Sequence, residues 1–321
     1  MKKVLIIKLG YSETLDPQIG NVTSYGDILR TTVLLHLYKN DHVTWLVDEK
    51  AYPILKGNKY IARILTYNAA STSQLQTEHF DTIINLEKIP AICALADSIK
   101  VRKRFGFGLN KKNRQTKAYD GSQEVLEICQ DIEKKRNQAS FWQVRLYEIV
   151  GAEWRGEGYI LGYKPKAKTI YDIGFNYQAG NKWPSKIWPK SNWEKLERLI
   201  GNKYKISWQH GLDNMEDYFE WINSCNLVIT NDSFGLHLAL ALKKKVLVMF
   251  GPTNHKEHFF YKRGWYILPD KIECNNFPCH NSKCTEKTSC LNYIYPERVL
   301  EKVNHIFKEE KKTTHEIYSN P

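Results

Sequence analysis

Short apolar runs alternate with helical patterns along the first half of the chain. The runs that we expect to form buried strands are residues 4–7, 43–47, 64–65 and 82–86, with 104–107 as an edge strand. Helical patterns lie between and after them, at 28–37, around 52–55, and at 124–133 and 141–150. Strands that alternate with helices in this way are typical of an α/β domain with a parallel, doubly wound sheet.

The alternation begins again after a basic, proline-interrupted segment, residues 163–168, which we predict to be a linker. The second series has strands at 171–176, 204–208, 227–230 and 246–250, and helices at 193–200, 216–224 and 236–242. A length of 321 residues fits two domains. We therefore predict domains at 1–162 and 163–321 that face each other across a cleft, and a frayed polar tail from Glu309 onward.

Polar and ionisable residues are concentrated where two strands of the second half end. Asp232, Ser233, Gly235 and His237 open a helix after the strand at 227–230, and Thr253 follows the next strand. Ligands of such sheets bind at the carboxyl ends of the strands. Free N–H groups at a helix start favour a phosphate, so the pattern predicts a site for a phosphorylated ligand.

The overall charge also favours an anionic partner. Lys and Arg number 47 against 35 Asp and Glu, a formal charge of +12. Nucleic acid, a membrane surface or a phosphorylated substrate would each suit this excess, although lysine-rich outer faces also account for much of it. The apolar run at 4–7 is too short for a signal peptide, and no stretch is long enough to span a membrane. We therefore expect a cytoplasmic protein with reduced cysteines.

Four segments in order resemble glycosyltransferase family 9, the ADP-heptose:lipopolysaccharide heptosyltransferases. They are "GDILRTTVLLHL", "NKWPSKIWPKSNWEKL", "NDSFGLHLALALKKKVLVMFGPT", and a cysteine cluster followed by "IYPERV". The resemblance implies a GT-B architecture, in which two Rossmann-like domains face each other. It further implies an acceptor bound mainly by the first domain and a nucleotide-sugar bound by the second.

The resemblance also implies site residues, each with a plainer alternative. Asp27 matches the catalytic aspartate, a general base in an inverting, metal-independent transfer, but could simply N-cap the following helix. Lys186 matches a lysine that binds the donor diphosphate, or is one exposed lysine among several. Asp232 would touch the donor sugar's hydroxyls and His237 would lie beside the phosphates, the alternatives being an N-cap and an inner-face histidine. Ser233, Gly235 and Thr253 would complete the donor site.

Three departures from the family pattern bear on the ligands. Residues 11–25 lengthen the first loop over the acceptor side. Phe234 stands where relatives often have glycine, which would reshape the sugar pocket. A strand with a Gly-Gly-Pro-x-Glu-like turn, whose acidic residue holds the nucleotide ribose, is missing, because the chain passes almost directly from 204–208 to the next helix. Asp213 and Glu216 are the acidic residues left nearby.

The clustered cysteines are Cys274, Cys279, Cys284 and Cys290. Their spacing is compatible with zinc without being diagnostic, and clustering in a cytosolic protein favours a metal over disulfides. Some relatives that glycosylate proteins carry cysteine-bound iron, so iron is an alternative; unmetallated thiols that pack a loop are another. In each case the expected role is structural, because the transfer itself requires no cofactor.

The expected function is transfer of a sugar, heptose first, from ADP-heptose or a similar nucleotide-diphospho-sugar. The acceptor would be a lipopolysaccharide-type or other surface glycan, reached by peripheral contact with the inner face of the cytoplasmic membrane. Another nucleotide-sugar or a protein acceptor is the alternative within this fold. A catalytically idle scaffold or a nucleic-acid-binding protein is the alternative from another class. Against nucleic acid, the basic residues are dispersed and no reader motif is present.

Overall fold

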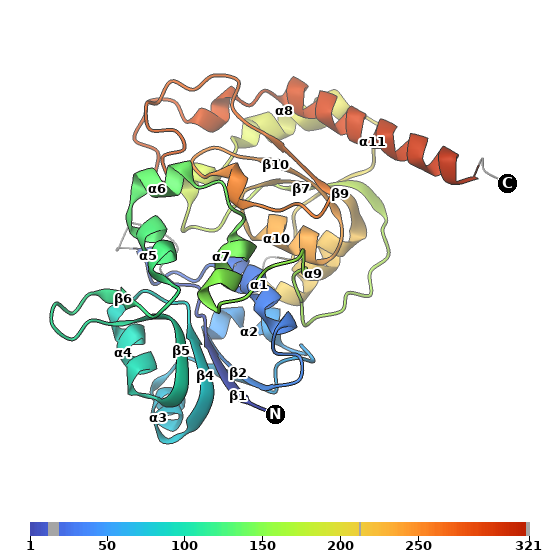
Figure 1. The fold of residues 1–321 in the computed structure, drawn as a ribbon. Helices are drawn as coiled ribbons and strands as arrows, with labels where there is room; N and C mark the ends of the chain where they lie inside the picture. The colour runs from blue at the N-terminus through green and yellow to red at the C-terminus, as the bar shows by residue number, and fades with distance from the viewer. Residues whose placement is uncertain (12–18, 212, 319–321) are drawn as a thin grey trace.

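The first half of the chain forms a six-stranded sheet in the order β3-β2-β1-β4-β5-β6. The structure, a computed structural model, describes residues 1–11, 19–211 and 213–318 (Figure 1). The strands are β1 (Lys3–Ile7), β2 (His42–Val47), β3 (Arg63–Thr66), β4 (His79–Asn85), β5 (Lys100–Leu109) and β6 (Thr116–Ala118). All neighbours pair in parallel except β5 and β6.

Helices cover this sheet on both faces. They are α1 (Tyr25–Thr31), α2 (Tyr52–Leu55), α3 (Ala69–Thr77), α4 (Pro90–Ser98), α5 (Gln123–Gln130), α6 (Ile132–Asn137) and α7 (Trp142–Ile149), with 3-10 turns at Thr32–His36 and Glu49–Ala51. Residues 4–7 of β1 are fully buried, which explains why the run is apolar without alternation.

The second half forms a five-stranded parallel sheet in the order β11-β10-β9-β7-β8. Its strands are β7 (Tyr171–Asn176), β8 (Ile206–Trp208), β9 (Cys225–Asn231), β10 (Lys245–Met249) and β11 (Gly264–Ile267). Its helices are α8 (Lys190–Ile200), α9 (Met215–Ser224), α10 (Phe234–Ala241) and α11 (Pro296–Tyr318), with 3-10 turns at Pro184–Lys186, His255–Glu257 and Cys290–Tyr293. Among the described helices, none combines the length and apolar character needed to cross a membrane.

The predicted fold class is confirmed: two doubly wound, mainly parallel sheets with helices on their faces. The predicted linker 163–168 contains no helix or strand and lies between the last helix of the first sheet and β7. The division of the chain at 162/163 stays a prediction. Almost direct passage from β8 to α9 is confirmed, since only residues 209–214 separate them.

Several predicted elements were wrong or missing. Residues 104–107 belong to β5, and they are an edge only in part, because the short, polar β6 pairs outside Phe107 and the two residues after it. The tail is not frayed at Glu309, because α11 continues to Tyr318; apolar residues at helical spacing anchor its first turns in the second core. The helix expected at 28–37 changes to a 3-10 turn after Thr31. Helices α3, α4 and α11 and strands β6 and β11 were not predicted.

Helices α1 and α10 hold the two halves of the molecule together. They pack side by side near the centre of the view in Figure 1, and their apolar residues belong to one buried cluster that draws on both sheets. The contact is close because residue 26 is glycine: a Cβ atom there would lie 2.6 Å from Cδ2 of His237. Since α1 follows β1 and α10 follows β9, this contact brings the carboxyl ends of both sheets to one place.

We expect Gly26→Ala to destabilise the protein by about 1–3 kcal/mol, because the added methyl group must displace the buried ring of His237 or separate the two helices. Chemical denaturation of the variant measures this loss. Gly158→Ala is the control, since a Cβ at residue 158 meets nothing within 4 Å. Gly151 also has open space, but its φ of +69° would strain an alanine there. Equal stability of Gly26→Ala and wild type would contradict a tight α1–α10 contact.

Candidate active site

A cavity of about 660 Å³ lies where the two halves meet. Its walls come from the segment between β1 and α1, the start of α10, the segments that follow β7 and β10, and parts of α6 and α7. In each sheet, the strand order reverses beside the strand that leads into this cavity, β1 in the first and β9 in the second. Such switch points are where open α/β sheets bind ligands.

The predicted catalytic and donor-binding residues are gathered at this cavity with one exception. Those that line it are Asp27, Lys186, Asp232, Ser233, His237 and Thr253. Gly235 does not: a Cβ atom there would lie 2.4 Å from Nδ2 of Asn176 and 2.8 Å from the hydroxyl of Tyr218. Glycine at this position therefore allows α10 to pack against β7 and α9, and the predicted donor contact of Gly235 lacks structural support.

Asp27 lies within α1 and carries a buried network. The N-cap of this helix is Ser24, so the N-cap alternative for Asp27 is wrong. The Ser24 hydroxyl donates to Oδ2 at 2.5 Å, and the Arg30 guanidinium donates to Oδ1. Burial alone would raise the pKa of Asp27, but Arg30, Lys8 and the Ser24 hydrogen bond together hold it well below its usual value. The carboxylate is thus ionised throughout the physiological range.

Asp232 is the centre of a second buried network, across the cavity. Its Oδ2 accepts hydrogen bonds from Lys186 Nζ at 2.7 Å and from the Thr253 hydroxyl at 2.6 Å. The Lys186 ammonium also lies 4.7 Å from the centre of the Trp183 ring. Burial would raise the pKa of Asp232, yet Lys186 and its hydrogen bonds keep it well below its usual value. The N-cap of α10 is Ser233, so Asp232 is not that helix's cap.

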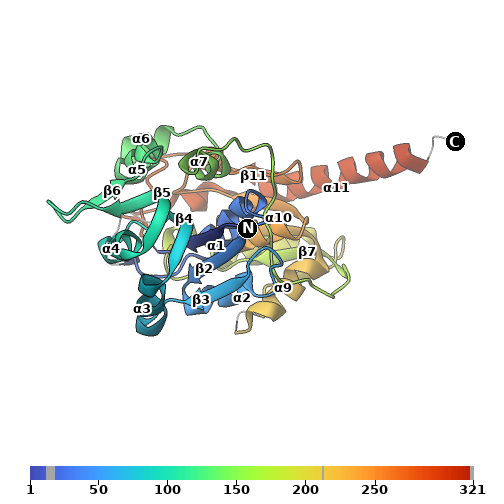
Figure 2. The same ribbon diagram turned by 60° about the horizontal axis from the view of Figure 1, so that its bottom comes forward.

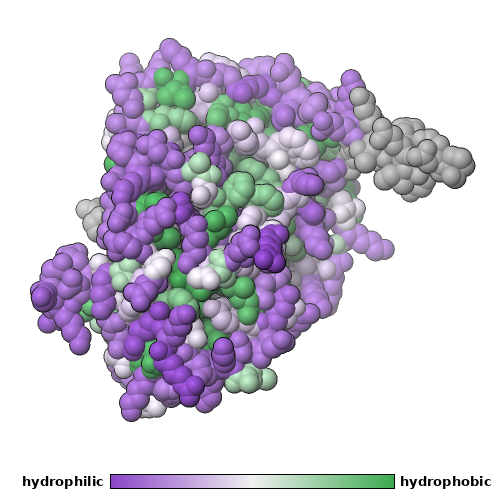
Figure 3. All heavy atoms as spheres, in the orientation of Figure 1, coloured by the Kyte–Doolittle hydropathy of each residue, from purple (hydrophilic) through white to green (hydrophobic). Residues whose placement is uncertain are grey.

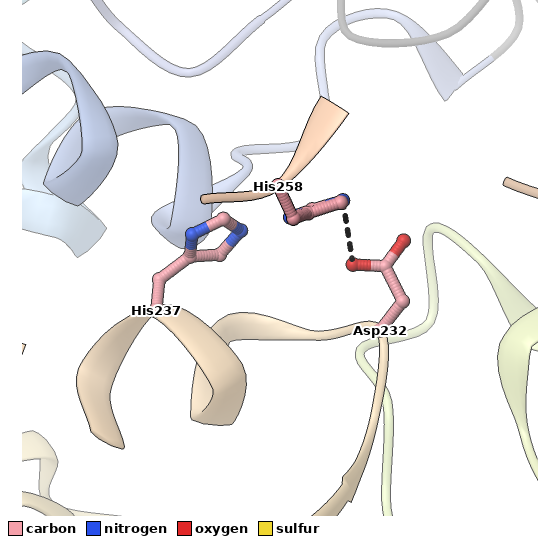
Figure 4. Close-up of side chains that lie close together, drawn as sticks. All are labelled: Asp232, His237 and His258. Carbon is pink, nitrogen blue, oxygen red and sulfur yellow. Dashed lines mark ion pairs between the residues drawn. The ribbon is translucent and has the colours of Figure 1, made fainter. Parts of the chain in front are cut away.

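Two histidines stand beside Asp232 (Figure 4). His258 Nε2 lies 3.7 Å from Oδ1 of Asp232, and Nδ1 of His237 has no hydrogen-bond partner among the described residues. Burial lowers the pKa of His258 to about 4 and that of His237 well below its usual value. Both imidazoles are therefore neutral at neutral pH, and the fixed positive charge of this wall belongs to Lys186.

Asp232, His237 and His258 are also the described residues that come closest to a metal-binding set. One ligand atom from each lies within 4.8 Å of the others. The Lys186 ammonium at 2.7 Å from the same carboxylate would repel a cation there. The arrangement suits an anionic group better than a metal ion.

The four clustered cysteines are not assembled in that way. All four are free thiols, of which Cys284 is exposed and the others are half-buried. Burial raises the pKa of Cys290 to about 11, and the charges of Cys279 and Cys284 add to this. The thiols therefore lie near one another, but within the described parts of the chain no three of their sulfur atoms come as close together as the ligand atoms of Asp232, His237 and His258.

Several residues of the cavity were not predicted. Arg30, Glu257, His258 and the lysines 135 and 182 line it. Arg30 could have been found, because a position three residues after Asp27 on a helix shares its face. Lys182 donates its ammonium protons to the carbonyl of Val22 at 2.6 Å, so the second half of the chain holds the first loop in place. The described part of the insertion 11–25 includes Tyr11 and Ser24; residues 12–18 lie outside the described residues.

The two acidic residues that the sequence left near the missing turn lie away from the cavity. Glu216 lies in the first turn of α9, where its carboxylate pairs with Lys56 at 3.1 Å. Neither Glu216 nor Asp213 lines the cavity. Phe234 does, with its ring 5.6 Å from that of Tyr25, so an aromatic wall stands where the sequence pattern indicated one.

Comparisons with known proteins agree with this geometry. The family model for glycosyltransferase family 9 (heptosyltransferase) matches residues 211–292. Lipopolysaccharide heptosyltransferase 1 of Campylobacter coli is 21% identical over 345 residues, covering 91% of this chain and 99% of that protein. The chain is also similar to the structure of E. coli ADP-heptose lipopolysaccharide heptosyltransferase II, with a TM-score of 0.65 at 15% identity and coverage of 96% and 99%.

A further similar structure is the iron-containing dodecameric glycosyltransferase TibC of enterotoxigenic E. coli. Its TM-score is 0.57 at 11% identity, over 96% of this chain and 76% of that one. At these identities the solved structures establish the GT-B fold, and the sequence matches carry the enzyme class. The chain is a heptosyltransferase-like glycosyltransferase that resembles family 9.

Proposed function

We propose that this enzyme transfers a sugar, heptose first, from a nucleotide-diphospho-sugar such as ADP-heptose to a lipopolysaccharide-type glycan, with inversion and without a metal. The observation that carries this proposal is the pairing of two networks in one cavity. Asp27 stands on the wall built by the first sheet, and Lys186 with Asp232 and Thr253 stands on the wall built by the second. An acceptor and a donor can therefore meet between them.

In the proposed reaction the acceptor hydroxyl attacks the anomeric carbon of the donor sugar. Asp27 takes the hydroxyl proton as the new C–O bond forms, and the bond from that carbon to the diphosphate breaks. Its low pKa keeps the carboxylate ionised and ready, while Arg30 and Ser24 fix its orientation. Inversion follows from one direct displacement.

The departing diphosphate needs positive charge and hydrogen-bond donors. Lys186 supplies a nearly buried ammonium group, with 15% of its side chain exposed, and Thr253, whose hydroxyl proton is donated to Asp232, fixes the carboxylate that holds this ammonium. Ser233 adds the N-terminus of α10, which has free N–H groups. These groups stabilise the charge that develops on the leaving group, the role that a metal ion has in other transferases.

A basic hairpin is suited to bring the enzyme to an anionic surface. Residues 98–119, which include β5 and β6, contain eight Lys and Arg residues and no Asp or Glu. Figures 2 and 3 show this hairpin extending from the body, with hydrophilic side chains covering it. Thr116 donates its hydroxyl to the carbonyl of Lys88, a cavity residue, at 2.6 Å, so the base of the hairpin adjoins the cavity. We propose peripheral contact with anionic membrane lipids here.

The proposed reaction is tested by incubating the enzyme with ADP-heptose and a lipopolysaccharide core acceptor. We expect product of inverted anomeric configuration at a rate that an excess of chelator leaves unchanged. ADP should bind more tightly than UDP or GDP. Retained configuration, or a rate that chelator abolishes and a divalent ion restores, would contradict the mechanism. No binding of any nucleoside diphosphate would contradict the function.

Replacing Asp27 by Asn should lower turnover roughly a hundredfold or more, because an amide cannot take the proton, while ADP affinity stays near wild type. The wild-type rate should not fall through protonation of Asp27 as pH decreases from 7 to about 4, since its pKa lies below the ordinary range. In Arg30→Gln the pKa of Asp27 rises, so an acidic limb should appear in the pH profile of kcat/KM. Turnover of Asp27→Asn within a few-fold of wild type would remove Asp27 from this role.

Lys186→Ala should weaken binding of ADP roughly tenfold or more and leave binding of adenosine nearly unchanged, because the lost partner is a phosphate. Lys190→Ala is the matched control, since its side chain is 71% exposed nearby. The variant leaves Asp232 buried without its cation, so Lys186→Ala combined with Asp232→Asn separates binding from lost stability. Equal weakening of ADP and adenosine by calorimetry would show that Lys186 does not contact the diphosphate.

Charge reversal at Lys111, Lys112 and Arg114 should abolish binding to phosphatidylglycerol vesicles. Each basic residue contributes about 1 kcal/mol near an anionic surface, so loss of three lowers partitioning by roughly a hundredfold or more. Reversal of Lys164, Lys166 and Lys168 in the exposed linker is the control. Co-sedimentation measures both. If both triple variants lose vesicle binding equally, the hairpin acts only through the net charge of the protein, and the proposed membrane contact there is wrong.

A further inference from the structure

Four carboxyl groups of the described residues line the cavity, and three of them have partners. Asp27 pairs with Arg30, Asp232 pairs with Lys186, and Asp48 accepts the hydroxyl proton of Tyr11. The fourth is Glu257, which is 9% exposed. Its Oε1 is buried without a hydrogen-bond partner among the described residues. Neither the sequence pattern nor the proposed reaction assigns this residue a role.

Glu257 is placed on the donor side. It ends the 3-10 turn His255–Glu257, which follows β10, and its chain neighbour His258 faces Asp232. Its backbone is held independently of its carboxyl group, since the side chain of Asn254 caps this turn through the N–H of Lys256. The carboxyl is therefore presented by a fixed turn that carries Thr253 at its start and His258 at its end.

Asp232 is held by an ion pair, whereas Glu257 has none among the described residues. Both Lys186 and Thr253 donate to Oδ2 of Asp232, while Nε2 of His258, 3.7 Å from Oδ1, is too far for a hydrogen bond and leaves that oxygen open. Oε1 of Glu257 is buried and filled by no described residue, and a carboxyl group carries several acceptor sites. A sugar hydroxyl can therefore donate to Glu257 as well as to Oδ1 of Asp232.

A buried polar group without a partner costs stability in the unliganded protein. A bound ligand can provide the missing partner, and the chemistry of the carboxyl decides which part of the donor this is. A carboxylate repels a diphosphate, whose charge is matched by Lys186, and accepts hydrogen bonds from uncharged hydroxyl groups. Burial also raises the pKa of Glu257, with Lys135 and Arg30 acting in the opposite direction and Asp232 in the same one.

We propose that Glu257 is a specificity-determining residue that accepts a hydrogen bond from a hydroxyl of the transferred sugar. The proposal rests on the proposed function, because it requires a nucleotide-sugar in this cavity. On the donor side, Lys186 would hold the diphosphate, and Glu257 would distinguish a donor that carries a sugar from the bare nucleotide.

The test compares binding of ADP and ADP-heptose by calorimetry in wild type, Glu257→Met and Glu257→Gln. Methionine has a similar length and no acceptor. It should leave ADP affinity within about twofold and weaken ADP-heptose roughly tenfold or more, the effect of losing one hydrogen bond to a carboxylate. Glutamine keeps one acceptor oxygen and should recover part of the loss. Glu301→Gln, on the exposed side of α11, is the control and should change neither.

Melting curves of the unliganded proteins show whether a loss of ADP-heptose binding in Glu257→Met comes from a loss of stability. Unliganded Glu257→Met should melt no lower than wild type, because it removes a carboxyl that has an unsatisfied oxygen. A Glu257→Met protein that keeps the full preference for ADP-heptose over ADP, or that loses both ligands equally, would overturn the proposal and leave the proposed function intact. If wild type binds none of ADP-heptose, ADP-glucose, UDP-glucose and GDP-mannose more tightly than the matching nucleoside diphosphate, the proposed function fails and this inference falls with it.

Discussion

Helix α1 can lie against helix α10 only because residue 26 has no side chain. The ring of His237 occupies the space where a Cβ would be, 2.6 Å away for the nearest ring atom. Helix α1 follows β1 and helix α10 follows β9, and beside each of these strands the order of strands in its sheet reverses. The contact between the two helices therefore places one of these switch points opposite the other. The cavity, the two carboxylate networks and the position of the neutral histidine all depend on this close approach.

The cavity then separates charge between its walls. Asp27 and Asp232 are both buried carboxylates, and each is kept ionised by a cation from its own half of the chain, Arg30 in one case and Lys186 in the other. The strongest cation beside each carboxylate comes from its own half of the chain, and Lys182 of the second half adds to the lowering of the pKa of Asp27. Each half of the chain therefore carries one buried ionised carboxylate with its cation, and both pairs face the same cavity.

Other polar groups of the cavity lie beside the Asp27–Arg30 and Asp232–Lys186 pairs. The neutral imidazoles of His237 and His258 can donate or accept a hydrogen bond without adding charge. Lys182 belongs to the second half of the chain and donates a hydrogen bond to the carbonyl of Val22 in the first loop, so it links the two halves. Glu257 keeps one buried carboxyl oxygen that no described residue fills.

The sequence by itself determined the fold class and most of the site. Fully apolar runs such as residues 4–7 require strands buried on both faces, and polar residues placed where such runs end identify the ligand-binding edge. Five of the six predicted donor residues, together with Asp27, line one cavity for this reason. The pattern did not predict β6, because a short polar strand has no apolar run that marks it. It also predicted a frayed tail from the polar composition there, whereas packing of α11 on α8 stabilises a helix.

Only the tertiary structure decided which polar groups meet. Gly235 looked like part of a phosphate-binding turn, yet its missing side chain makes room for Asn176 and Tyr218. Glu257 and His258 lie beyond the recognisable signature, so nothing in their spacing placed them beside Asp232. Nor could the sequence show that Asp232 is already engaged by Lys186, 46 positions away. Local patterns fix which residues reach the end of a strand. The partners of each side chain depend on how the two sheets and their helices pack against each other.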